Sequence, residues 1–200
     1  MAYYEGYVTI PHNTYDEWRN AVNGNGYNYD YTYGCQCYDL AAEFWWNVGF
    51  PAGYPIIDQS SAYRMWYYRT QNTSYNGEDY FQLIYNLSDV KRGDVMVFNY
   101  TSYNQYGHVG FADIDYNSWT PDPNQPYEFP ILSQNNSGTP SPQGGAYANI
   151  HGYDIRLFLG AFRYKKWNDT PPTPPTPTVR RKGKFPWVLY ARKLNRMRNN

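Results

Sequence analysis

The stretch that decides the fold runs from residue 34 to residue 48 and reads GCQCYDLAAEFWWNV. Its apolar residues recur every three or four positions, which is the period of one face of an α-helix. These residues are Cys37, Leu40, Ala41, Phe44 and Val48. Gly49 and Pro51 follow, and both are typical of the end of a helix. The pattern predicts an amphipathic helix that begins near Cys37 and packs this face against a core.

Cys35 and Cys37 are the only cysteines in the chain. Two cysteines are too few for a disulfide framework, and a bridge between positions i and i+2 would need a strained backbone. The start of a helix offers free N–H groups and the positive end of the helix dipole, which stabilise a thiolate. Cys37 is therefore a candidate nucleophile, whereas no partner for Cys35 is evident.

A cysteine nucleophile needs a base, and the chain has three histidines, His12, His108 and His151. His108 begins a predicted strand in the phrase YGHVGFADID, next to a glycine that leaves room, so it can lean over the start of a helix. The other two histidines lie in turn-like contexts without such support. His108 is the candidate base, although an inert buried cysteine and an unrelated histidine would explain the same residues.

The second ring nitrogen of such a base needs a hydrogen-bond acceptor that fixes its tautomer and orientation. The later run EFPILSQN predicts a strand on which Ser133 and Asn135 share one face. Asn135 is therefore the candidate for the orienting residue, with Ser133 one step away on the same face.

The surrounding elements indicate an α+β domain. Thr14 and Glu17 have the spacing of a capping box and predict a helix that ends near Gly24, and residues 60–71 predict another. Apolar or alternating runs, bounded by Gly, Pro and Asn, predict strands over residues 94–99, 107–115, 128–135 and 154–164. Helices followed by antiparallel strands indicate helices packed on one face of a sheet.

Composition divides the chain into a domain over residues 1–168, a Pro/Thr-rich linker over 169–178 and a basic aromatic tail over 179–200. Residues 1–178 contain nine Lys or Arg and 17 Asp or Glu, whereas the tail contains eight Lys or Arg and no acid. The chain is thus an acidic domain with a basic tail. The 25 tyrosines suit either a core or a surface that faces carbohydrate or peptide.

The first residues, MAYYEGYVTIPHNTY, contain neither a basic region nor an apolar core, so we expect no signal peptide. No run approaches the ~18 consecutive apolar residues of a transmembrane segment. The tail suits an anionic polymer, a membrane leaflet, a nucleic acid or a protein partner, and a merely solvated tail is the simpler alternative. A nucleic-acid-binding function is disfavoured because the acidic domain would repel phosphates.

Four segments of the chain stand out together: QCYDLAAEFW, RGDVMVFNY, YGHVGFADI and ILSQNNSG. In this order they resemble the signature segments of CHAP domains, the cysteine, histidine-dependent amidohydrolase/peptidase modules of phage lysins and bacterial wall hydrolases. The resemblance runs from about residue 27 to residue 167. It implies a papain-like fold and a phage-type peptidoglycan hydrolase, either an endolysin or a virion-associated lysin, that cleaves an amide bond of the wall peptide.

The resemblance implies that Cys37 is the nucleophile, that His108 is the general acid and base, and that Asn135 orients it. Gln36 would help to form the oxyanion hole or, alternatively, would only cap the helix. Ser133 stands where such lysins often carry Glu, and a neutral residue cannot stabilise an imidazolium as a carboxylate would. This departure keeps a second function open, a catalytically weak wall-binding or phage tail structural module.

The resemblance also implies a structural calcium ion, and no organic cofactor, in the loop before the nucleophile. Calcium takes six to eight oxygen ligands, and alternate residues of a curled loop can point inward. The implied ligands are Asn28, Asp30, Thr32, Gly34 and Asp39. The alternative is a tyrosine-rich loop in which Asp39 only caps the helix.

The implied partners are bacterial peptidoglycan and, through the basic tail, an anionic wall polymer or a virion protein. Without a signal peptide, such an enzyme would reach the wall from the host cytoplasm by holin-assisted release, or would be carried in the phage particle. The muramoyl–alanine amide and a peptide bond have the same tetrahedral chemistry, so the residues do not choose between an amidase and an endopeptidase.

Overall fold

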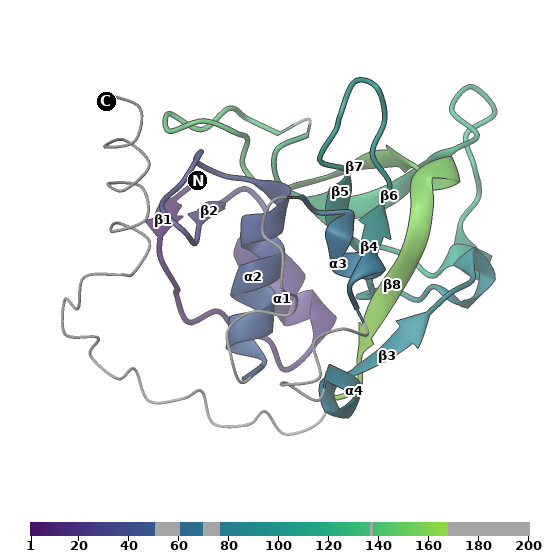
Figure 1. Ribbon diagram of the computed structural model, residues 1–200, viewed down its shortest axis with the longest axis horizontal. Coiled ribbons are helices and arrows are strands. Elements are labelled where there is room, and N and C mark those ends of the chain that lie inside the picture. The colour runs from purple at the N-terminus through teal and green to yellow at the C-terminus, as the bar shows by residue number, and fades with distance from the viewer. Residues whose placement is uncertain (51–60, 70–76, 137, 168–200) are drawn as a thin grey trace, which may run out of the picture.

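The computed structural model describes residues 1–50, 61–69, 77–136 and 138–167 (Figure 1). The predicted linker at 169–178 and the predicted tail at 179–200 lie outside the described residues. Within the described part, none of the helices has the length and apolar character that a membrane span requires.

The core of the molecule is a six-stranded sheet with the strand order β3-β8-β4-β5-β6-β7, in which all neighbours are antiparallel. The strands are β3 (Phe81–Ile84), β4 (Val95–Phe98), β5 (His108–Ala112), β6 (Glu128–Ser133), β7 (Asn149–Asp154) and β8 (Phe158–Tyr164). The strands predicted at 94–99, 107–115 and 128–135 are confirmed as β4, β5 and β6, but β5 ends at Ala112 and β6 at Ser133, earlier than predicted. The predicted strand at 154–164 is wrong at its start, because a 3₁₀ turn over Ile155–Leu157 separates the end of β7 from β8.

The two faces of this sheet are both apolar. Val97, Val109 and Leu132 pack with the helices in one hydrophobic cluster. Phe98 and Ile131 lie on the opposite face in a second cluster. All four residues of β4 are buried, because this strand lies inside the sheet with a cluster on either side.

Two helices cover one face of the sheet (Figure 1). They are α1 (Tyr15–Val22) and α2 (Cys37–Asn47), and a two-stranded parallel sheet, β1 (Tyr3–Glu5) with β2 (Gly26–Asn28), lies beside them. The predicted cap of α1 is confirmed, since the Glu17 backbone N–H donates to Thr14 Oγ1 at 3.2 Å. The rings of Trp18 on α1 and Phe44 on α2 meet at 5.1 Å between centroids. Phe44 also packs edge-to-face on Phe111 of β5, so the predicted apolar face of α2 is confirmed.

Two shorter helices, α3 (Arg64–Tyr67) and α4 (Gly77–Tyr80), precede β3. The helix predicted over 60–71 is thus confirmed at its centre, and residues 60, 70 and 71 lie outside the described part of the chain.

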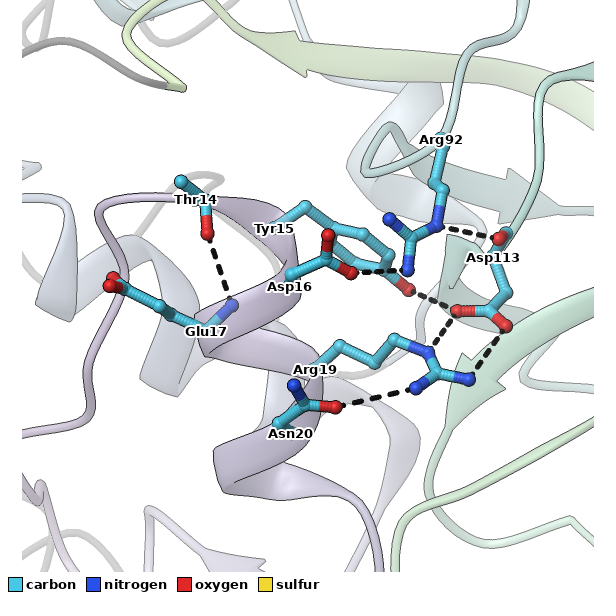
Figure 2. Close-up of polar contacts among 8 residues, drawn as sticks. All are labelled: Thr14, Tyr15, Asp16, Glu17, Arg19, Asn20, Arg92 and Asp113. Carbon is cyan, nitrogen blue, oxygen red and sulfur yellow. Dashed lines mark hydrogen bonds and ion pairs between the residues drawn. The ribbon is translucent and has the colours of Figure 1, made fainter.

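A group of charged residues ties α1 to the end of β5 (Figure 2). Arg19 donates to both carboxylate oxygens of Asp113, at 2.6 and 3.2 Å, and Tyr15 donates its hydroxyl to Asp113 at 3.2 Å. Arg92 donates to the Asp113 backbone carbonyl and forms an ion pair with Asp16 at 2.6 Å. Because Asp113 follows β5 directly, this cluster fixes the strand that begins with His108 against the helical layer.

The N-terminal segment is held to α2 by two buried polar side chains. Asn47 accepts from the Ile10 backbone N–H at 2.7 Å and donates to the Val8 carbonyl at 3.0 Å. Glu43 accepts from the Val8 N–H at 3.2 Å and is fully buried. Helix α2 is consequently covered on both sides, which explains why its polar positions are also buried.

Candidate active site

Cys37 is the first residue of α2, with Gln36 as the N-cap. Burial raises the pKa of the Cys37 thiol to about 11, although the backbone N–H groups of Val109 and Tyr38 lower it. The sequence predicted that the helix start would stabilise a thiolate. The structure instead has a neutral thiol at pH 7, because desolvation outweighs the contribution of the backbone donors.

His108 begins β5, and its imidazole is held on two sides. A hydrogen bond of 2.7 Å joins its Nε2 to Ser133 Oγ on β6. The ring of Tyr153, on β7, stacks on it at 4.5 Å between centroids with 12° between the planes. Gly110 leaves the space between His108 and Ser133 open, since a Cβ there would lie 2.9 Å from Ser133 Cβ. Nε2 is thus engaged, and Nδ1 is left for proton exchange.

Cys37 and His108 line the same cavity, whose volume is about 610 Å³. Gln36, Asn135 and Tyr106 also contribute to its wall. Burial lowers the pKa of His108 to about 3, so this imidazole is neutral at pH 7. The cavity therefore contains a thiol and an imidazole that both start uncharged, a pair that can pass a proton when the sulfur attacks.

The prediction that Asn135 orients His108 is corrected by the structure. Strand β6 ends at Ser133, and Asn135 adopts a left-handed backbone with φ of 57°, so the alternation of faces does not continue to it. Its side-chain NH₂ donates to Gln36 Oε1 at 2.5 Å. Ser133 takes the position next to the histidine ring, and Asn135 supports Gln36, the residue that precedes Cys37.

Gln36 is held at both ends of its side-chain amide, because its Nε2 donates to the Tyr33 carbonyl at 2.7 Å while its Oε1 accepts from Asn135. The fully buried Gln134 donates to the Gln36 backbone carbonyl at 2.8 Å and also bonds both backbone polar groups of Tyr27. The end of β6 is therefore attached directly to the start of α2, which positions Cys37 relative to the strands.

The five residues predicted to hold calcium lie in and beside the loop that follows β2. Asn28 and Asp30 both accept the Thr32 backbone N–H, at 3.0 and 2.8 Å, so their side-chain oxygens converge on one turn. Asp39 accepts the Gln36 N–H at 2.7 Å, which confirms its capping role. Gly34 is buried against the backbone of residues 143–144.

The two carboxylates of this loop interact unfavourably with each other. Burial raises the pKa of Asp39 well above its usual range, and the charge of Asp30 raises it further. Burial also raises the pKa of Asp30. The described residues contain no cluster of three His, Cys, Asp or Glu, so any cation here would depend on amide and backbone oxygens as well. Such a donor set, two carboxylates with neutral oxygens, fits the chemistry of calcium.

Two contributors to the site were not foreseen from the sequence. Tyr153 packs on His108, and burial raises the pKa of its phenol to about 12. His151 lies with its ring centroid 6.1 Å from that of His108. Both belong to β7, whose run NIHGYD has too little apolar character to be recognised as a strand.

Comparison with known proteins gives a match to a family model and matches to solved structures. A model of the CHAP domain family matches residues 24–120. Among solved structures, the wild-type endolysin LysIME-EF1 is similar, with 23% sequence identity and a TM-score of 0.48 over 76% of this chain and 65% of that chain. The chain thus spans less than two thirds of the length of that endolysin. No curated protein sequence matches the chain.

Proposed function

Because a model of the CHAP domain family matches residues 24–120, we propose that the chain is a cysteine-dependent peptidoglycan hydrolase that cleaves an amide bond of the wall peptide. One observation carries this proposal. Cys37 at the start of α2 and His108 at the start of β5 line one cavity, and Nε2 of the histidine ring is fixed by Ser133. These contacts support the proposal, because acyl transfer requires a nucleophile, a base and a group that orients the base.

In the first step, Cys37 Sγ attacks the carbonyl carbon of the amide, and His108 Nδ1 takes the thiol proton. The C=O π pair moves to oxygen and forms a tetrahedral oxyanion. The Cys37 backbone N–H and the Gln36 side chain are the proposed donors to this oxyanion. Gln36 is suited to this role because Tyr33 and Asn135 hold its amide in place before substrate arrives.

In the second step, the imidazolium of His108 gives its proton to the leaving amine as the C–N bond breaks, which leaves a thioester on Cys37. Water, deprotonated by the same imidazole, then hydrolyses the thioester and restores the thiol. Ser133 supports the imidazolium by hydrogen bonding and not by charge, so we expect a lower turnover than a carboxylate would give at this position.

The test is lysis of purified Gram-positive walls by the full chain and two matched cysteine variants. Cys37→Ala should abolish lysis, whereas Cys35→Ala should retain it, because Cys35 is buried away from the cavity lining. Thermal melting of each variant verifies that it is folded. Equal clearing by the wild type and Cys37→Ala would contradict the proposal. Mass spectrometry of the digest identifies the bond: a new N-terminal alanine indicates an amidase, and a new N-terminal glycine indicates a cross-bridge endopeptidase.

Ser133 favours one second candidate, a module that binds the wall with little or no catalysis, because the residue next to His108 has no charge. Sedimentation with purified walls separates the two functions. Binding without release of new N-termini would support the second candidate, and release that depends on Cys37 would support the hydrolase.

We also propose that the loop after β2 binds calcium through Asn28, Asp30, Thr32, Gly34 and Asp39. When bound, the ion would supply positive charge that offsets the mutual repulsion of Asp30 and Asp39. Its role would be structural, because these residues join the loop to the first turn of α2, where Asp39 already accepts the Gln36 N–H.

A further inference from the structure

Three polar side chains, one on each of the strands β5, β6 and β7, form a line across the sheet. The proposed reaction involves His108 and Ser133 but not the third, His151. His108 on β5 bonds Ser133 on β6 at 2.7 Å, and Ser133 Oγ lies 3.4 Å from Nε2 of His151 on β7. The other nitrogen of His151, Nδ1, lies 3.3 Å from the backbone carbonyl oxygen of Asn149. His108 and Ser133 are buried, and His151 is half-buried.

The sheet register places these groups in reach of one another. Strands β5, β6 and β7 are consecutive neighbours, and Ser133 pairs with Asn149 while Ile131 pairs with His151. Ser133 and His151 are therefore diagonal neighbours on one face of the β6–β7 pair, a separation that an aromatic side chain can span. Ser133 can contact a histidine on each side because Gly110 contributes no side chain between it and His108.

The hydrogen bonds of this line have a single consistent direction. A backbone carbonyl only accepts, so Nδ1 of His151 carries the proton and its Nε2, in the neutral ring, has a lone pair. Ser133 then donates its O–H to His151 Nε2 and presents its own lone pairs to His108. His108 in turn donates from Nε2, which leaves its Nδ1 unprotonated. Burial lowers the pKa of His151, which agrees with a neutral ring.

We propose that His151 is a positioning residue that acts through Ser133 to hold His108 in the tautomer with the proton on Nε2. This inference rests on the proposed function for its catalytic meaning, because only that tautomer can take the Cys37 proton at Nδ1. Without His151, the Ser133 hydroxyl can rotate and donate to His108, which stabilises the other tautomer. His151 thus gives His108 the orientation that a carboxylate gives the histidine of a charged triad.

The experiment measures the tautomer directly and separately from catalysis. The full chain is labelled with ¹⁵N-histidine, and long-range ¹H–¹⁵N correlation spectra report the protonated nitrogen of each ring, with a His108→Gln sample to assign the signals. The wild type should show His108 protonated at Nε2. His151→Phe keeps an aromatic ring without an acceptor, and His151→Gln keeps an oxygen that can accept from Ser133.

We expect His151→Phe to populate the Nδ1-protonated form of His108 and to lower kcat about tenfold at unchanged KM. We expect His151→Gln to retain most of the Nε2-protonated form and most of the wild-type kcat. The proposal is overturned if His108 in the wild type is protonated at Nδ1, a result that needs no variant to fold. It is also overturned if His151→Phe leaves the tautomer and kcat unchanged, or if both variants lower kcat equally without moving the tautomer. If the wild type and Cys37→Ala both leave walls intact, the proposed function fails, and the tautomer in His151→Phe still decides this inference.

Discussion

At the scale of the residue, burial decides the charge of the two groups that we propose to react. The thiol of Cys37, with a pKa near 11, and the imidazole of His108, with a pKa near 3, are both uncharged through the neutral range. Papain-like chemistry can start from such a pair, because the proton moves as the sulfur attacks. In the proposed reaction the charge would develop only in the transition state, where the proposed oxyanion donors would stabilise it.

The pH dependence of kcat/KM should reflect this neutral pair. We expect a flat profile between about pH 5 and pH 8, with the acid limb well below the ordinary histidine value of ~6.5. Initial rates of wall lysis across this range are the measurement. An acid limb between pH 6 and pH 7 would show that His108 titrates as a solvated histidine and would contradict the neutral pair.

The pH dependence of folding stability has to be measured as the control for that rate profile. Below pH ~6.5 an unfolded chain protonates its histidines, whereas folded His108 stays neutral until about pH 3. Stability therefore falls as the pH drops through this window. Circular dichroism at each pH separates this loss of folded protein from a change in turnover.

Glu43 gives a second prediction at this scale. Burial raises its pKa to about 8, so the folded protein keeps its proton at pH values where the unfolded chain has lost it. Its contribution to stability is present below pH ~4.5 and is lost as the pH rises through about 8. Glu43→Gln retains an acceptor for the Val8 N–H and should stabilise the protein at pH 9 by on the order of 3 kcal/mol, with little effect at pH 4.5.

Urea titrations at the two pH values measure this difference. The exposed Glu5 provides the matched control, since Glu5→Gln should change neither value appreciably. A stabilisation by Glu43→Gln that is equal at both pH values would show that proton binding is not its cause.

At the scale of the element, the end of β6 organises the site. Three consecutive residues contribute to it. Ser133 bonds His108, the buried amide of Gln134 bonds the backbone at the start of α2, and the side chain of Asn135 holds that of Gln36. The left-handed backbone at Asn135 makes this possible, because it turns the third side chain away from the face that the strand pattern would give it.

Two substitutions at Asn135 separate its side chain from its backbone. Asn135→Gly and Asn135→Ala both remove the bond to Gln36, so both should lower kcat by about tenfold if Gln36 is an oxyanion donor. Only alanine also strains the left-handed backbone, which should cost a further ~1 kcal/mol in the free energy of unfolding. Rates and urea titrations measure the two effects. Wild-type kcat in both variants would exclude a role of the Asn135–Gln36 contact in turnover.

At the scale of the whole molecule, the loop after β2 connects the N-terminal layer to helix α2, and this is where we propose that calcium acts. We expect calcium to raise the melting temperature by about 5 °C or more at saturating concentration, because a ligand bound only by the folded state stabilises it. Chelator should reverse the shift. Asp30→Asn should abolish the response without removing the cap that Asp39 provides. A wild-type melting temperature that is indifferent to calcium and chelator would remove the site.

The sequence predicts the parts of this molecule whose pattern is local. Helix α2, its buried face and the cap of α1 follow from spacing alone, and the strand that begins at His108 follows from its apolar run. The exchange of roles between Ser133 and Asn135 could not be predicted, because it depends on where β6 ends and on a single left-handed residue. His151 and Tyr153 were missed because β7 is half-buried along its whole length, so its residues do not alternate in polarity.

The strand order has a consequence for synthesis of the protein. Strand β8 is the last strand of the described chain, yet it lies between β3 and β4 in the sheet. On the ribosome, β3 therefore has no sheet partner until residue 164 has left the exit tunnel, and β4 has only one. We expect nascent chains that stop before β8 to be protease-sensitive even though Cys37, His108 and Ser133 have already been made. The sheet, and the cavity that depends on it, would then form in one step near the end of translation.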